Sequence, residues 1–306
     1  MNRSMAVLAA IGVITLPGSC VATPVKGIAK PAIVAPAIVV AKPAPVRRLG
    51  RFQLNRAPEQ GGLSYGTVPF GTVRLSIDGN AVSFDSDGVF VLGFGRDHGA
   101  TATLLAVMGD GKSVSEQLVV ATRAWKIENL ATVQHHSQPD IEFAARRPAE
   151  LDQINAARRI AVNSKGWRQK FIWPSRGRIS GLFGSQRIYA GVPGSAHSGV
   201  DVAGGFGAAV VAPADGVVTL AAAAPFTLEG NLLIIDHGMG LNSNFLHLSR
   251  IMVKPGDSVR QGQLVGAIGA TGRASGPHLH WGMKWKNERI DPVPIAGPML
   301  APVPKR

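Results

Sequence analysis

Short apolar runs separated by turn residues dominate the chain between residues 61 and 132. The runs cover residues 68–75, 81–84, 89–94, 101–107 and 115–120. Asp-Gly and Gly-Asp pairs fall between them, as in Asp78-Gly79-Asn80, and such pairs favour the tight turns of β-hairpins. This pattern predicts a small antiparallel β-sandwich, similar to an immunoglobulin domain. Nothing in its residues indicates chemistry, so we expect an accessory β-module at 61–132.

Helical spacing follows at residues 139–166. Leu151, Ile154, Ala157 and Ile160 recur at intervals of three and four after Pro148-Ala149-Glu150, and Gly166 gives a C-terminal stop signal. We therefore predict a connecting helix, whose arginines lie on its solvated face.

The chain becomes rich in strand signals again from about Lys170. Apolar runs bounded by glycines lie at Ile179, Val200, 210–211, 217–220, 232–235, 245–248 and 264–268. The chain has 37 Gly and 21 Pro but only 6% aromatic residues, which also favours strands and turns over long helices. The predicted fold class is mainly β, with a C-terminal antiparallel sheet domain at 171–295 and a short tail at 296–306.

The N-terminus is typical of an exported protein. Arg3 precedes an apolar stretch at 5–16, and small residues lead to Ala22, so we interpret 1–22 as a signal peptide. Cleavage after Ala22, lipidation of Cys20 and retention as an uncleaved anchor remain open. Residues 23–60, rich in Pro, Ala, Val and Lys, read as an extended linker. We expect the protein in the periplasm or cell envelope. A secreted form and a lipid-anchored form are also open, and the N-terminal segment would then provide any association with the envelope.

Charge restricts the classes of binding partner, and cysteine content restricts how the fold can be stabilised. The net charge is +13, from 32 basic and 19 acidic residues, and no Asp or Glu precedes Glu59. Part of the basicity thus belongs to the leader and linker, and no basic run interleaved with aromatic residues indicates a nucleic-acid partner. Cys20 is the single cysteine, so no intramolecular disulfide forms, and packing or a metal must stabilise the fold.

Candidate chemistry lies in the histidines. The chain has 8, and five of them fall within residues 197–280. His197 and Asp201 carry two zinc-ligand types four residues apart, although a spacing of this kind also arises by chance. His278 and His280 flank Leu279, so on a strand both imidazoles share one face. Such a pair suits a metal or proton-transfer site, and a pair of surface histidines is the alternative.

Several motifs occur together in one order along the chain. They are His197-Ser198-Gly199-Val200-Asp201, residues 230–238 with Phe245-Leu246-His247-Leu248, residues 253–259 with 262–263 and 269–272, and Gly276-Pro277-His278-Leu279-His280. This series resembles the lysostaphin-type (LytM-like) zinc metalloendopeptidase family over residues 171–295. The linker and the accessory module lie outside the resemblance.

The resemblance implies roles at matching positions. His197, Asp201 and His280 match zinc ligands, and His247 and His278 match catalytic histidines, so one Zn²⁺ per chain is expected. Phe245 stands where relatives often carry Tyr. Three protein ligands leave a zinc position open, as catalytic rather than structural zinc requires. The thermolysin-like His-Glu-x-x-His motif is absent from the sequence.

One further histidine and the alternative functions complete the predictions. We interpret His237 as structural, with Asp236 holding a turn. The predicted function is an exported zinc endopeptidase that cuts peptidoglycan stem peptides or cross-links. A non-catalytic wall-binding or amidase-activating scaffold is the alternative. A biotin- or lipoyl-carrier function is disfavoured because no Lys occurs between Gly256 and Gly272. The bond cut and the oligomeric state are not readable, nor is whether the accessory module binds, spaces or covers the site.

Overall fold

The structure, a computed structural model, describes residues 51–131 and 141–299. The predicted signal peptide, Cys20, residues 23–50 of the predicted linker and most of the C-terminal tail lie outside the described residues. Those described belong to one compact unit. Among them, no helix is both long and apolar enough to span a membrane.

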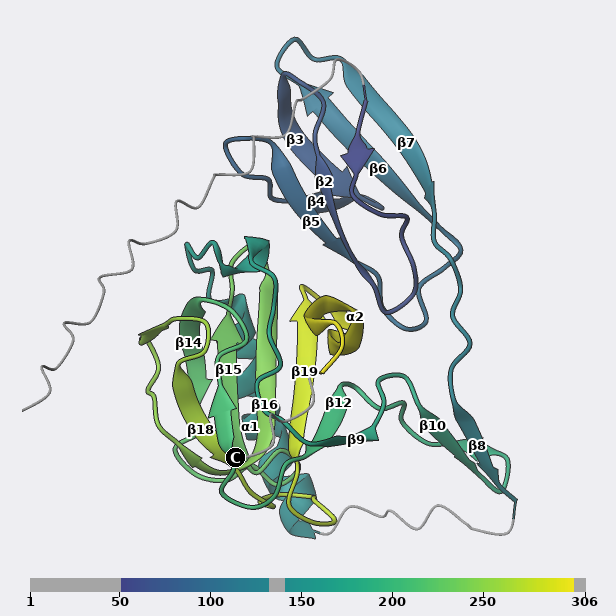
Figure 1. Ribbon diagram of the computed structural model, residues 1–306. Coiled ribbons are helices and arrows are strands. Elements are labelled where there is room, and N and C mark those ends of the chain that lie inside the picture. Colours follow the sequence, from purple (N-terminus) through teal and green to yellow (C-terminus); the bar gives the residue numbers. More distant parts are fainter. Residues whose placement is uncertain (1–50, 132–140, 300–306) are drawn as a thin grey trace, which may run out of the picture. The chain divides into compact units, whose positions relative to one another are not determined.

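Two antiparallel sheets form the accessory module, defined here as residues 51–121. One sheet has the order β1-β2-β5 and the other β4-β3-β6-β7. Alternate residues of β6 are buried, including Leu104, and Phe90 and Leu92 of β5 are fully buried. The strands are β1 (Gln53–Leu54), β2 (Leu63–Thr67), β3 (Thr72–Ile77), β4 (Asn80–Val82), β5 (Val89–Gly93), β6 (Thr101–Met108) and β7 (Ser113–Val119). The predicted β-sandwich-like module is confirmed (Figure 1).

Two local expectations for this module differ from the structure. The apolar run at 68–75 is not one strand, because Gly71 takes φ 85° and the Thr72 hydroxyl donates to the Pro69 carbonyl at 2.7 Å. The chain turns there, and β3 begins at Thr72. Residues 51–60, expected to belong to the linker, contain β1, which pairs with β2. Phe52 is 7% exposed and packs edge-on against Phe90.

A ten-stranded antiparallel sheet forms the C-terminal part. Its main path is β17-β14-β15-β16-β19-β12-β9, with β13, β18 and β20 paired at its sides. Figure 1 shows β14, β15, β16 and β19 side by side. The strands are β9 (Arg178–Gly181), β12 (Val200–Ala203), β13 (Ala209–Val211), β14 (Gly216–Ala221), β15 (Asn231–Asp236), β16 (Leu241–Ile251), β17 (Ser258–Val259), β18 (Leu264–Ile268), β19 (Leu279–Trp285) and β20 (Glu288–Ile290). The predicted mainly β class with a C-terminal antiparallel sheet is confirmed.

A long helix connects the two parts. Helix α1 (Ile141–Arg159) contains Pro148 in its interior, and it ends before the predicted stop at Gly166. A short helix η1 (Gly166–Arg168) occupies that later position. Ile154 and Ala157 of α1 are buried with Leu232, Ile234 and Leu246 of the large sheet. Helix α1 therefore covers one face of β15 and β16.

A small sheet links the segment after the accessory module to the rim of the large sheet. Strand β8 (Ile127–Leu130) pairs in parallel with β10 (Gln186–Tyr189), which pairs with β11 (Val192–Pro193). The end of the predicted module at 61–132 thus pairs outside that module. A last helix, α2 (Pro292–Ala296), is capped by Asp291, whose side chain accepts from the Val293 amide at 3.0 Å.

Candidate active site

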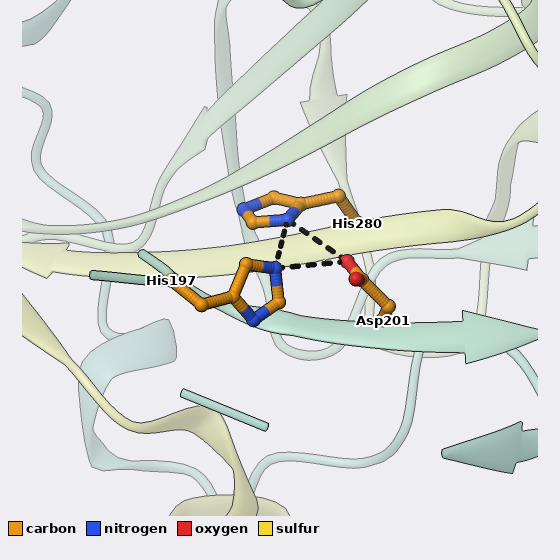
Figure 2. Close-up of side chains that lie close together, drawn as sticks. All are labelled: His197, Asp201 and His280. Atoms are coloured by element: carbon orange, nitrogen blue, oxygen red, sulfur yellow. Dashed lines mark hydrogen bonds and ion pairs between the residues drawn. The ribbon is translucent and has the colours of Figure 1, made fainter. Parts of the chain in front are cut away.

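Three side chains converge at the junction of β12 and β19. His197 Nε2 lies 3.1 Å from Asp201 Oδ1 and 3.0 Å from His280 Nδ1. His280 Nδ1 lies 3.0 Å from Asp201 Oδ1, which closes the triangle shown in Figure 2. His280 is 5% exposed, while His197 and Asp201 are partly exposed. The structure thus brings together the three residues expected as metal ligands.

Strand register places two of them opposite one another. Asp201 on β12 pairs directly with His280 on β19, and His280 pairs on its other side with Leu246 on β16. His197 precedes β12, and its backbone is held by two hydrogen bonds, to Ser185 O at 2.8 Å and from Gly184 N at 2.9 Å. These bonds bend the chain so that its ring returns over Asp201.

Glycines keep the cluster compact. A Cβ at Gly181 would collide with Asp201 Oδ2, and one at Gly199 would lie 2.7 Å from His280 Nε2. Because real Cβ atoms do not approach other atoms so closely, any side chain here would displace the cluster.

The donor set fits a divalent cation. In the neutral ring, His197 Nδ1–H donates to the Leu182 carbonyl at 3.0 Å, which leaves the lone pair of Nε2 directed at Asp201 and His280; only the protonated ring donates from Nε2 to Asp201. A tetrahedral ion with bonds of about 2.0–2.1 Å places its ligand atoms about 3.3 Å apart, close to the spacing here. A backbone carbonyl behind a metal-binding histidine is also the usual arrangement. Two imidazole nitrogens and one carboxylate oxygen suit zinc.

Electrostatics within the cluster point the same way. Burial alone would raise the pKa of Asp201, but its hydrogen bonds to His197 and His280 hold that pKa well below its usual range. Burial likewise disfavours the charged form of His197, yet the bond to Asp201 raises the pKa of His197 overall. Asp201 is therefore a full carboxylate that attracts positive charge.

Two further histidines stand beside the cluster. The ring centroids of His247 and His278 are 4.8 Å apart, and His278 Nε2 lies 3.7 Å from Asp201 Oδ1. His247 Nδ1–H donates to the Thr271 carbonyl, and His278 Nδ1–H donates to the Gly276 carbonyl, each at 2.8 Å. Both Nε2 atoms are consequently unprotonated in the neutral rings. The structure places both expected catalytic histidines at this site.

His247 has an unusual backbone. It lies within β16 with φ 63°, a conformation that is costly for a residue other than Gly and is found mainly at functional sites. Its amide donates to the Glu229 carbonyl at 2.9 Å, and the register of β16 shifts just after it. Burial lowers the pKa of His247 to about 4, so the ring is a neutral base at neutral pH.

His237 and Phe245 lie elsewhere. His237 is fully buried between the Asp215 carbonyl at 2.8 Å and the Ser243 hydroxyl at 2.9 Å. Asp236 accepts from the Gly238 amide at 2.7 Å, so both residues serve the fold. Phe245 is fully buried in register with Trp281. The ring at this position packs in the hydrophobic core.

Sequence reasoning missed the groups that orient these histidines. The carbonyls of Leu182, Thr271 and Gly276 fix the tautomers of His197, His247 and His278. Backbone carbonyls carry no residue-specific signal, and only Thr271 and Gly276 fall within motifs singled out in the sequence.

Comparison with known proteins agrees with this geometry. Residues 195–292 match the model of peptidase family M23. The chain is 36% identical over 139 residues to peptidoglycan DD-endopeptidase ShyA of Vibrio cholerae, covering 45% of this chain and 32% of that protein. It is 32% identical over 127 residues to murein hydrolase activator NlpD of Escherichia coli, covering 42% of this chain and 30% of that protein. The chain thus spans about a third of the length of these curated relatives.

A solved structure extends the similarity beyond the matched segment. A crystal structure described as a peptidase M23 from Pseudomonas aeruginosa superposes with a TM-score of 0.62 at 27% identity, covering 79% of this chain and 96% of that one. This coverage is too large to come from residues 195–292 alone, so the shared fold includes more than the site domain. Over residues 195–292, this chain is thus similar to peptidase family M23.

Proposed function

We propose that this protein is an exported, zinc-dependent endopeptidase that hydrolyses peptide bonds in peptidoglycan stem peptides or cross-links. The observation that carries the proposal is the convergence of His197, Asp201 and His280 with His247 and His278 on one side of the sheet. The similarity to peptidase family M23 and to a peptidoglycan DD-endopeptidase supports the substrate class.

His197, Asp201 and His280 would hold the zinc. Bound zinc acidifies water and polarises the carbonyl of the bond to be cut. Two neutral imidazoles and one carboxylate leave a net charge of about +1 on the assembled centre. Leu182 keeps His197 in the tautomer that presents Nε2 to the metal.

His247 and His278 would move the protons. In its neutral form each ring presents an unprotonated Nε2, because its Nδ1–H is held by a carbonyl. One ring accepts a proton from the attacking water. The imidazolium so formed then donates an N–H to the developing oxyanion or a proton to the leaving amine. The short distance between the two rings lets both act on one substrate carbonyl.

The location follows from the substrate. Peptidoglycan lies outside the cytoplasmic membrane, so we place the protein in the periplasm or cell envelope, with residues 1–22 as its export signal. Mass analysis of the protein recovered from producing cells measures the mature N-terminus. A start at Thr23 supports simple cleavage, whereas a lipid-modified Cys20 supports anchoring and an intact Met1 contradicts processing.

Digestion of isolated peptidoglycan tests the activity. The purified full chain, with and without a chelator, is incubated with peptidoglycan, and mass spectrometry identifies released fragments. We expect peptide fragments with new amino termini that disappear with chelator and return with zinc. The His280→Ala variant, prepared in parallel, should release none. A wild-type protein with a full equivalent of zinc and no release would contradict the proposal.

An activator role is the second candidate, because the chain also resembles murein hydrolase activator NlpD. An activator stimulates another hydrolase and needs no metal site of its own. Adding the His280→Ala variant to a peptidoglycan amidase separates the two functions. Full stimulation by this variant would support activation, and stimulation by neither variant nor wild type would reject it.

A further inference from the structure

Three cationic side chains gather beside the candidate active site with no hydrogen-bond or ion-pair partner among the described residues. Arg158 at the end of α1, Lys284 on β19 and Arg289 on β20 line a cavity of about 140 Å³. Within residues 51–131 and 141–299, none of the three forms an ion pair or hydrogen bond through its side chain. Arg158 Nε is completely buried and has no acceptor. The prediction that the arginines of α1 lie on a solvated face is therefore wrong for Arg158.

The cations repel one another. Burial lowers the pKa of Lys284 to about 8, with further lowering from Arg158 and Arg289. Burial and the charge of Arg289 also lower the pKa of Arg158. Holding unpaired charges in a partly buried pocket is costly, and buried groups without partners call for an explanation.

Nearby carboxylates offset these charges only in part, since Glu229 acts to raise the pKa of Arg158 and Glu288 that of Lys284. Glu229 lines the same cavity, but Arg147 binds it through two bonds of 2.6 and 2.8 Å. Glu150 accepts from the Thr227 amide and hydroxyl at 2.7 and 2.6 Å. Glu288 directs its carboxylate against Gly95. The pocket therefore keeps an excess of positive charge that an external anion would balance.

The cationic pocket adjoins the candidate active site. Ser198, Lys284 and Arg289 line both this cavity and a neighbouring one of about 620 Å³, which also reaches His197. Lys284 follows His280 by four residues on β19, so both side chains project from the same face. A strand rises about 3.3 Å per residue, which separates the two positions by about 13 Å.

That separation matches an extended peptide. About four residues of substrate in extended conformation would span from the bond at His280 to Lys284. Gly282 lies midway between them, and a Cβ there would collide with Asn244 Oδ1. The strand face between the two positions thus carries no side chain of its own from β19.

We propose that Arg158, Lys284 and Arg289 form a subsite that binds a carboxylate of the peptide substrate. The inference rests on the proposed endopeptidase function, because peptidoglycan stem peptides carry free carboxylates. Guanidinium and ammonium groups form charge-assisted hydrogen bonds with carboxylates, roughly twice as strong as neutral ones. The subsite would thereby select substrates with a free carboxylate over those in which this group is amidated.

Paired peptides and paired variants test the subsite. One stem peptide carries free carboxylates, and the other is identical but amidated. The Lys284→Met variant removes one pocket cation, and Lys254→Met makes the same change on an exposed lysine of another loop. For the zinc-loaded full chain, we expect Lys284→Met to lower kcat/KM for the free-carboxylate peptide about tenfold, mainly through KM. Lys254→Met should behave as wild type, with its preference for the free-carboxylate peptide intact.

Binding to the metal-free full chain separates failure of the subsite from failure of the proposed function. Calorimetry measures both peptides against wild type and Lys284→Met. Cleavage without discrimination between the peptides would overturn the subsite and leave the endopeptidase standing. No cleavage, with tighter binding of the free-carboxylate peptide that Lys284→Met abolishes, would support the subsite and reject the endopeptidase.

Thermal unfolding distinguishes a substrate-binding role of Lys284 from a structural one, because only a structural lysine would stabilise the fold. Removing one of three mutually repelling cations should leave the unfolding midpoint of Lys284→Met unchanged or raised relative to wild type. A clearly lowered midpoint together with equal loss on both peptides would overturn the inference, because Lys284 would then support the fold and not the substrate.

Discussion

The imidazole rings of His247 and His278 face each other at 4.8 Å between centroids, and each is anchored through Nδ1 to a different backbone carbonyl. The rings come from β16 and from the residue before β19, two strands paired in the middle of the sheet. Their orientation is thus fixed before any substrate binds, and both present a basic nitrogen on the side where Asp201 lies.

Replacing His278 and replacing His280 should have separable effects. We expect His278→Ala to lower kcat by about 10²–10⁴-fold, the usual contribution of a general acid or base, while zinc binding persists. His280→Ala should lose both activity and zinc binding, because it removes a proposed zinc ligand. Zinc stoichiometry by elemental analysis, measured beside peptide cleavage, tells them apart. Equal loss of zinc in both variants would contradict the assigned roles.

Metal removal should destabilise the fold as well as the activity. A ligand that binds only the native state stabilises it by about 4 kcal/mol when its free concentration is 1,000 times Kd. We expect a chelator to lower the thermal midpoint of wild type, and added zinc to restore it. The Asp201→Asn variant supplies the control, and an equal response of its midpoint to zinc would argue against this site.

Acid should unfold the protein partly through His237. Burial lowers the pKa of His237 to about 4, so the unfolded chain, with its ordinary pKa near 6.5, binds the proton first as pH falls. Stability from this residue is therefore present above about pH 6.5 and is lost toward pH 4, by about 2 kcal/mol between pH 7 and 5.

To isolate the contribution of His237, wild type is compared with the His237→Gln variant, both in the presence of a chelator. Asp236 acts in the opposite direction, because burial raises its pKa to about 6, and its contribution declines as pH rises through that value. Urea unfolding of both proteins at pH 7 and pH 5 cancels the shared contributions. A pH dependence as steep in His237→Gln as in wild type would show that another group causes the acid sensitivity.

A methyl group at Gly181 should disrupt the ligand cluster. Its Cβ would collide with Asp201 Oδ2 and lie 3.0 Å from His197 Cε1, so Gly181→Ala should weaken zinc binding at least about tenfold, the effect of about 1.4 kcal/mol. Gly99→Ala is the matched control, since its Cβ would meet nothing nearer than 4.0 Å. Competition with a zinc-binding dye measures both affinities. Equal affinities would mean that the cluster tolerates displacement.

Sequence patterns predicted which sheets and helices form better than they predicted where each element begins and ends. Alternation and turn residues indicated the sandwich-like module and the large sheet, because burial of one strand face dictates such periodicity. The break at Pro69–Gly71 was missed, since apolar residues continue on both sides of it. The helix predicted over 139–166 ends earlier than expected, and α1 contains Pro148 in its interior. Burial against Leu232 and Leu246 outweighs the local cost of the proline.

The site was predicted from residue types and order, but not its orientation. Spacing placed His278 and His280 on one face, and family resemblance linked His197 to residues far along the chain. No pattern could predict that His247 adopts φ 63°. Nor could one predict that the Arg158 Nε is buried without a hydrogen-bond acceptor among the described residues. Both depend on how α1, β16 and β19 pack together, which is set by the tertiary fold.

The direct pairing of Asp201 with His280 has a consequence for biosynthesis. These residues are 79 positions apart in the sequence, and contacts of high sequence separation form late, because the intervening chain must first be ordered. A nascent chain that ends before β19 lacks the His280 donor entirely. The three candidate metal ligands therefore come together only in the finished sheet, and a chain truncated before His280 would leave the ribosome without one of them.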